Sequence, residues 1–190
     1  MDVTDVLELI RGRRSIKAFE PEPVSRETIE PLLDAAVWAP NHKMTEPWRF
    51  YVLGPETKRA FAELRRRLRA EKLPDPDAPE VKKALEKAYR DAADAPALIV
   101  VSCAESDDPV RRDEDYAATA MAVQNLLLAA AAAGLGTYLR TGDILERPEL
   151  RALLGAPDEH RLFGVVYLGA PEEIPVKKRT PASEKTTWLP

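Results

Sequence analysis

Two stretches decide the fold of this chain: R-G-R-R-S-I-K-A-F (Arg11 to Phe19) and A-P-N-H-K-M-T-E-P-W-R-F (Ala39 to Phe50). The first places cations and a hydroxyl directly after a short predicted helix, which we expect to end near Gly12. The second is a polar loop bounded by proline that runs into an aromatic, strand-like segment. Because arginine forks beside a hydroxyl suit an oxyanion, the first stretch is a candidate phosphate site. Arginines beyond a helix C-terminus also stabilise the helix dipole without any ligand.

The composition predicts one globular domain, residues 1–190. The chain is 45% hydrophobic and 32% charged, as packed proteins are. Its formal net charge of −4 argues against a nucleic-acid partner, because a broad basic face is lacking. Cys103 is the only cysteine, so we expect neither an intrachain disulfide nor a cysteine-rich metal site, and its apolar surroundings predict a buried strand thiol. With only His42 and His160 as histidines, we expect no metal site at all.

The apolar run 117–135 approaches the length of a membrane span. Thr119, Gln124 and Asn125 interrupt it, and we interpret it as a buried core helix in which the two amides are hydrogen-bonded core groups. Acidic residues at the beginning of the chain are unlike the cationic start of a signal peptide. The sequence therefore predicts a cytoplasmic protein with no membrane segment.

Periodicity and turn residues predict the order of the elements. Expected helices begin at about residue 2 or 4 and run to 10, then cover 26–37 (capped by Ser25), 55–71, 80–93 (after a loop at 73–79), 111–133 and 148–154, and expected strands cover 48–53, 97–103, 137–140 and 162–168. We expect the arginine-rich run 65–69 to be a solvated helix face. We expect Trp38 to fill core, with packing against a cofactor as the alternative. The segment 72–95 is a candidate lid, and the tail 170–190 cannot bury much by itself.

A third stretch, G-L-G-T-Y-L-R-T-G (Gly134 to Gly142), completes a pattern that resembles the nitroreductase family. The resemblance covers nearly the whole chain and is weakest between residues 72 and 95. It implies an α+β fold, with a mixed β-sheet flanked by helices around a long central helix. It also implies a homodimer with two FMN sites at the subunit interface, the tail 170–190 packing on the partner.

The resemblance also implies which residues contact FMN. Arg13, Arg14 and Ser15 would bind its phosphate and ribityl chain, and Lys17 would approach the N1/C2-carbonyl edge of the ring. His42 would reach the ring across the interface, as in a subgroup of the family with the sequence A-P-x-H-K. The segment Leu139, Arg140, Thr141 and Gly142 would lie along the flavin. Lys178 or Arg179 would return from the tail to the phosphate. Lys17, Arg140 and the tail cations could equally be solvated, and His42 could be a surface residue or a general acid. Glu46 and Trp38 depart from the family pattern.

The implied activity is that of an FMN-dependent oxidoreductase. It would pass hydride from NADH or NADPH through the flavin to a nitroaromatic, a quinone or a similar small-molecule acceptor, in ping-pong fashion. Because the flavin N5 carries the chemistry, no catalytic side chain is named. The chain has no G-x-G-x-x-G after a strand, so a nicotinamide would visit the flavin pocket transiently. The sequence also allows an FMN carrier or sensor without turnover, and a same-fold flavoenzyme for reductive dehalogenation or flavin breakdown.

Overall fold

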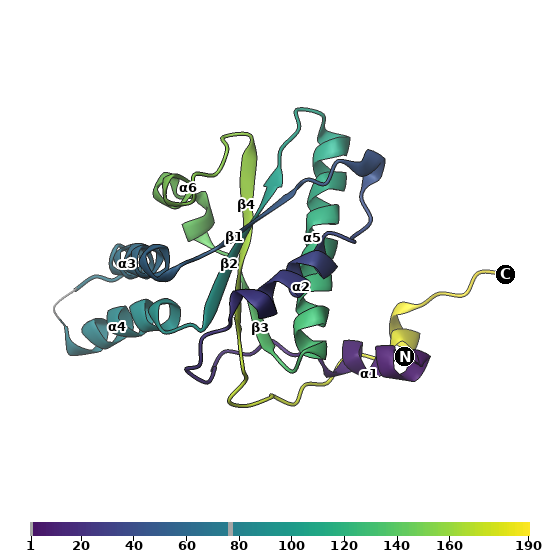
Figure 1. Cartoon of the computed structure of the whole chain (residues 1–190), viewed down its shortest axis with the longest axis horizontal. Coiled ribbons are helices and arrows are strands. Elements are labelled where there is room, and N and C mark those ends of the chain that lie inside the picture. The colour runs from purple at the N-terminus through teal and green to yellow at the C-terminus, as the bar shows by residue number, and fades with distance from the viewer. Residues whose placement is uncertain (1, 76–77) are drawn as a thin grey trace.

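A computed structural model describes residues 2–75 and 78–190 of the chain and shows a sheet with helices on both faces (Figure 1). One face packs against the long helix α5 (Pro109–Ala132) and against α2 (Arg26–Ala36). The other face is covered by three helices: α3 (Pro55–Ala70), α4 (Pro79–Ala93) and α6 (Pro148–Leu154). This three-layer arrangement confirms the expected α+β class.

The sheet has the strand order β1-β2-β4-β3. Its strands are β1 (Trp48–Val52), β2 (Ala97–Ala104), β4 (His160–Gly169) and β3 (Gly136–Arg140). All neighbours in it are antiparallel, whereas we expected a mixed sheet. The parallel pairing that the structure does contain is the isolated bridge between Ser15 and Thr137. A single bridged residue is too short to count as a strand, so the basic segment borders β3 without extending the sheet.

The two central strands, β2 and β4, explain why the sheet forms where the sequence predicts it. Both are buried along nearly their whole length, because helices cover both faces, and both read as continuous apolar runs. Cys103 lies in β2 and is buried as expected, and burial raises the pKa of its thiol. The central part of the sheet is therefore buried on both faces, and β3 lies at the edge, where it borders the basic segment.

The remaining elements lie at the ends of the sheet and of the chain. Helix α1 (Val3–Gly12) precedes the basic segment and contains no buried residue. Three short 3₁₀ helices are η1 (His42–Met44), η2 (Asp143–Glu146) and η3 (Ala182–Lys185). The Ser25 hydroxyl accepts a hydrogen bond from the Thr28 N–H, which confirms the predicted cap of α2. Within the described residues no helix is both long and apolar enough to cross a membrane.

Three side chains lie where we did not expect them. Arg65 is buried, only 8% exposed, because it lies one helical turn from Phe61 on the face of α3 that packs on the sheet. Trp38 is 85% exposed, because it follows the C-cap of α2 where the chain leaves the core. Gln124 is exposed on the outer side of α5, whereas its neighbour Asn125 donates to the Ala35 carbonyl at 3.3 Å. The expectations of a solvated arginine run, a core tryptophan and a core glutamine were therefore wrong at these positions.

Candidate functional site

Arg13 lies at the end of α1, where its guanidinium is half-buried among other cations. Burial lowers the pKa of Arg13, and the positive charges of Arg179 and Arg14 lower it further. No described carboxylate forms an ion pair with Arg13. Since like charges brought together without a counterion repel each other, this group of arginines is a favourable site for an anion.

Arg14 connects the C-terminal tail to the end of α1. Its Nε donates to the Pro175 carbonyl at 3.1 Å, and its Nη1 donates to the carbonyl of Arg13 at 2.9 Å and to that of Arg11. These bonds bring the tail back past α1, which places Arg179 close enough to affect the pKa of Arg13. Of the two tail candidates, Arg179 is the one whose charge acts on Arg13, and Lys178 is exposed beside it.

Ser15 and Lys17 flank a buried anchor at the edge of the sheet. The Ile16 N–H donates to the Thr137 carbonyl at 2.8 Å, and the Ile16 side chain is buried. Gly136 permits this close approach, because a Cβ there would lie 2.6 Å from Ile16 Cγ1. With Ile16 turned inward, Ser15 and Lys17 are exposed, and the Lys17 Nζ lies 5.6 Å from the centroid of the Tyr138 ring.

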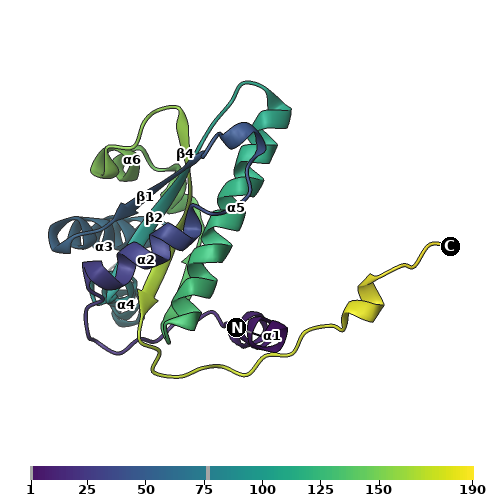
Figure 2. The ribbon, with the colours of Figure 1, turned by 45° about the vertical axis from the view of Figure 1, so that its right-hand side comes forward.

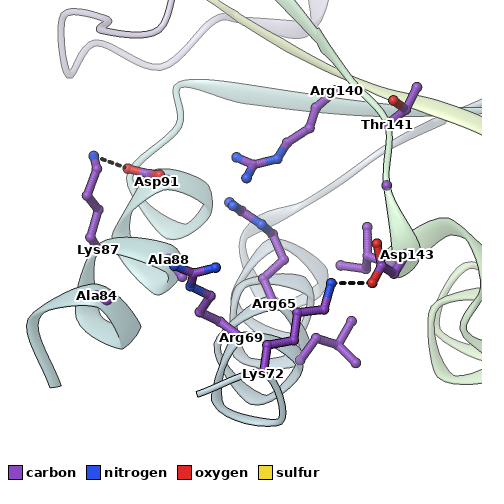
Figure 3. A pocket seen from close by; sticks show the side chains of 13 residues that line it. Arg65, Arg69, Lys72, Ala84, Lys87, Ala88, Asp91, Arg140, Thr141 and Asp143 are labelled. Atoms are coloured by element: carbon purple, nitrogen blue, oxygen red, sulfur yellow. Dashed lines mark hydrogen bonds and ion pairs between the residues drawn. The ribbon is translucent and has the colours of Figure 1, made fainter. Parts of the chain in front are cut away.

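The end of β3 sends its side chains to alternate faces, as a strand must. Leu139 packs on the α5 side of the sheet, and Arg140 points to the opposite side, toward Arg65 (Figure 3). Thr141 and Gly142 follow at an exposed turn, where Gly142 has φ 134°, a conformation that favours glycine. Within the described residues, no group accepts a hydrogen bond from the backbone N–H of Thr141 or of Gly142. Both N–H groups can therefore donate to a ligand.

His42 lies in a strained loop at the other end of α5. Its Nδ1 is 2.6 Å from Glu114 Oε2, and the neighbouring Thr45 hydroxyl donates to the buried Asp115 at 2.6 Å. Lys43, Met44 and Glu46 all have φ near +50°, which is uncommon for residues other than glycine and often marks a functional loop.

The long helix separates this loop from the arginines. Glu114 lies near the start of α5, and Ala131, which lines a small cavity with Arg13, lies near its end. At 1.5 Å per residue the two positions are about 25 Å apart. A single chain therefore does not bring His42 and Arg13 together. Any site containing both needs a second protomer.

Four cations near the end of β3 were missed as candidates. They are Arg65, Arg69, Lys72 and Lys87, and with Arg140 they line a cavity between α3, α4 and the β3–η2 turn. The spacing of Arg65 from Phe61 was the sequence signal that could have revealed the buried position. No group of three or more metal-ligating side chains was found in the part of the chain that the structure describes.

Comparison with known proteins identifies the family to which this chain belongs. Residues 10–170 match the model of the nitroreductase family. YfhC of Bacillus subtilis, assigned by name to the NAD(P)H nitroreductases, is 36% identical over 96% of this chain and 93% of its own length. The chain therefore belongs to the nitroreductase family and is an enzyme of the nitroreductase type.

Solved structures agree with this assignment. A nitroreductase-like family protein from Bacillus cereus superposes with a TM-score of 0.81, at 30% identity over 100% of this chain and 98% of the other. A Desulfovibrio desulfuricans protein solved in complex with FMN gives a TM-score of 0.72, at 26% identity over 97% of this chain and 96% of the other.

Proposed function

We propose that this protein is an FMN-dependent oxidoreductase that passes hydride from NADH or NADPH to a nitroaromatic, a quinone or a similar acceptor. The observation that carries the proposal is the group of arginines around Arg13, which forms no ion pair through Arg13 with any described carboxylate and borders the edge of β3 in a chain of this family. Bound FMN would supply the hydride chemistry at its N5 atom. The protein binds, orients and shields the reactants.

The described residues fit a flavin mononucleotide along the edge of β3. Arg13 and Arg179 would hold the phosphate through charge-assisted hydrogen bonds, and the exposed Ser15 hydroxyl would donate beside them. Lys17 extends over Tyr138 and places a positive charge near the ring. The free N–H groups of Thr141 and Gly142 can donate to a ring atom and fix its orientation. Arg14 would support this group indirectly by holding the tail.

A homodimer would complete the site. The apolar face of α1 (Val3, Val6, Leu7 and Ile10) is between 40% and 72% exposed, although such a face is normally buried. Figures 1 and 2 show the C-terminal segment leaving the body on the same side as α1. The tail carries further exposed apolar residues, Ile174, Val176, Trp188 and Leu189. We infer that α1, the outer face of α5 and the tail 170–190 pack against a second copy, whose His42 then approaches the flavin.

The absorption spectrum of the purified protein tests the proposed function. We expect a yellow protein whose flavin bands bleach when NADH or NADPH is added without oxygen, and recover when a quinone is added. A colourless protein that does not bind added FMN would contradict the proposal. Bound FMN that neither nicotinamide reduces would indicate a carrier or sensor. Release of halide from a substrate would indicate a reductive dehalogenase, and breakdown of the flavin during turnover would indicate a flavin-degrading enzyme. The cytoplasmic location stays a prediction.

A further inference from the structure

A cavity of about 470 Å³ lies between α3, α4 and the turn after β3 (Figure 3). Arg65 and Arg69 enter it from α3, Lys87 from α4, and Arg140 from the end of β3. The figure shows the guanidinium groups of Arg65 and Arg140 pointing toward one another. Thr141 lines the same cavity, so it opens beside the turn that we assign to the flavin ring.

The positive charge in this cavity is only partly balanced by the carboxylates that line it among the described residues. Of its five cations, Lys72 is paired with Asp143, and Lys87 is paired with Asp91 at 3.0 Å. Arg65, Arg69 and Arg140 form no ion pair with any carboxylate in residues 2–75 and 78–190. Among the described residues, three guanidinium groups therefore share one cavity without an ion-pair partner of their own.

The buried charge of Arg65 destabilises the protein when no anion occupies the cavity. Its side chain is buried, and its Nη1 donates to the Tyr167 hydroxyl at 2.8 Å, which uses one of five N–H donors. Burial lowers the pKa of Arg65, and the charge of Arg140 lowers it further, while Asp91 has the opposite effect. Arginine nevertheless stays protonated in proteins, so a buried positive charge remains. An anion that enters the cavity would relieve both the desolvation and the repulsion.

We propose that this cavity binds the phosphate group of a small molecule, at a site separate from the arginines around Arg13. Three guanidinium groups, two from α3 and one from the end of β3, match the several oxygens of a phosphate better than the two oxygens of a carboxylate. Neighbouring apolar side chains, Leu68 and Ile144, could contact the organic part of such a molecule.

The phosphate could be a free ion or part of a larger molecule. Because the cavity opens beside Thr141 and Gly142, the phosphate of a hydride donor is the source that fits the proposed function: NADPH carries a 2′-phosphate that NADH lacks. This assignment of the source rests on the proposed function, whereas phosphate binding itself does not.

Binding is tested by calorimetry on the purified protein saturated with FMN, or on its Arg13→Ala variant if no FMN binds. The probes are inorganic phosphate and adenosine 2′,5′-bisphosphate in a buffer free of other oxyanions. Arg69→Gln removes an exposed cation from the cavity, and we expect it to weaken binding of both probes about 10-fold. The control is Arg66→Gln, because Arg66 lies beside Tyr89 outside the cavity. Arg65→Met is a second variant, which is used if its thermal unfolding shows that it is folded.

Steady-state kinetics test which molecule supplies the phosphate group. If NADPH supplies the phosphate, Arg69→Gln raises the KM for NADPH about 10-fold, leaves the KM for NADH unchanged and leaves kcat unchanged. If both probes bind and both KM values stay unchanged, the cavity binds a free phosphate or another phosphorylated molecule, which also supports the proposal. Absence of binding by the wild-type protein, or equal binding by wild type and Arg69→Gln, would overturn it. The calorimetric results do not depend on whether FMN is reduced.

Discussion

Arg13 is the residue on which the proposed phosphate site depends most. Its half-buried guanidinium has cations as neighbours and forms no ion pair with a carboxylate in the described part of the chain, so an FMN phosphate would be its natural partner. Arg13→Ala should weaken FMN binding about 10- to 100-fold, since a hydrogen bond to a charged group contributes about 1.5–3 kcal/mol. Fluorescence titration of FMN measures the change. Arg59→Ala, at an exposed position on α3, should bind as the wild type does. Unchanged affinity of Arg13→Ala would remove Arg13 from the site.

His160 predicts a pH dependence of stability. The ring is buried, its Nδ1 lies 3.0 Å from the Ser102 hydroxyl, and burial followed by the charge of Arg49 lowers its pKa below 6.5. The folded state therefore binds fewer protons at His160 than the unfolded state does. Its contribution to stability is complete above about pH 7.5 and is lost progressively as the pH falls below about 6.5.

Urea denaturation of the wild type at pH 7.5 and at pH 5.5 tests this expectation. The free energy of unfolding should be smaller at pH 5.5, while His160→Gln, which cannot titrate, should show a flatter dependence. The lowered pKa of Asp143 does not interfere, because that carboxyl titrates below its ordinary value of 3.8. Equal slopes in the wild type and the variant would show that His160 does not titrate on unfolding.

At the level of elements, the contact between the basic segment and β3 positions Ser15 and Lys17. Gly136→Ala would place a Cβ 2.6 Å from Ile16 Cγ1 and 2.9 Å from its Cβ. Because Ile16 is buried and hydrogen-bonded to Thr137, it cannot move away freely. We expect a loss of about 1–3 kcal/mol in the free energy of unfolding, as in other overpacked sites. Gly12→Ala is the control, because a Cβ there would meet no atom within 4 Å.

The helices and strands could be predicted because the local signals in them agree. The apolar runs of β2 and β4, the Ser25 cap, and Pro148 at the start of α6 all lie where the sequence places them. The sheet type could not be predicted, because pairing direction is set by which strands meet, and β1 and β2 are joined through two intervening helices.

The residues that were misplaced show where local patterns fail. The run around Arg65 looks like a solvated face by composition, and only its register with Phe61 and Leu68 reveals that one arginine points inward. Trp38 looks like core by its size, but the end of α2 turns it outward. The cations around Arg13 could be predicted from the family resemblance. The cavity around Arg65 could not, because it depends on how α3, α4 and β3 pack together.

At the scale of the whole molecule, the unpartnered surfaces of one chain lie together. Helix α1 has no buried residue, Met121 and Gln124 are exposed on the outer side of α5, and the tail leaves the body beside α1 (Figure 2). His42 and Arg13 lie near opposite ends of the same helix, so one chain cannot bring them to one ligand. A second copy that packs on this side would bury the apolar surfaces and would supply the missing part of each flavin site.

Leu7→Asp therefore tests assembly and cofactor binding together. A carboxylate in the centre of the apolar face of α1 would lose its hydration if the dimer formed, so we expect the variant to be a monomer at micromolar concentration. Light scattering coupled to size exclusion measures the mass, and the flavin absorbance of the same peak measures the FMN content. We expect the FMN content to decrease when dimerisation is lost. Glu8→Gln, on the opposite face of α1, should stay dimeric and keep its FMN. A dimeric Leu7→Asp would show that α1 does not form the interface. A monomer that retains all its FMN would show that the site needs only one chain.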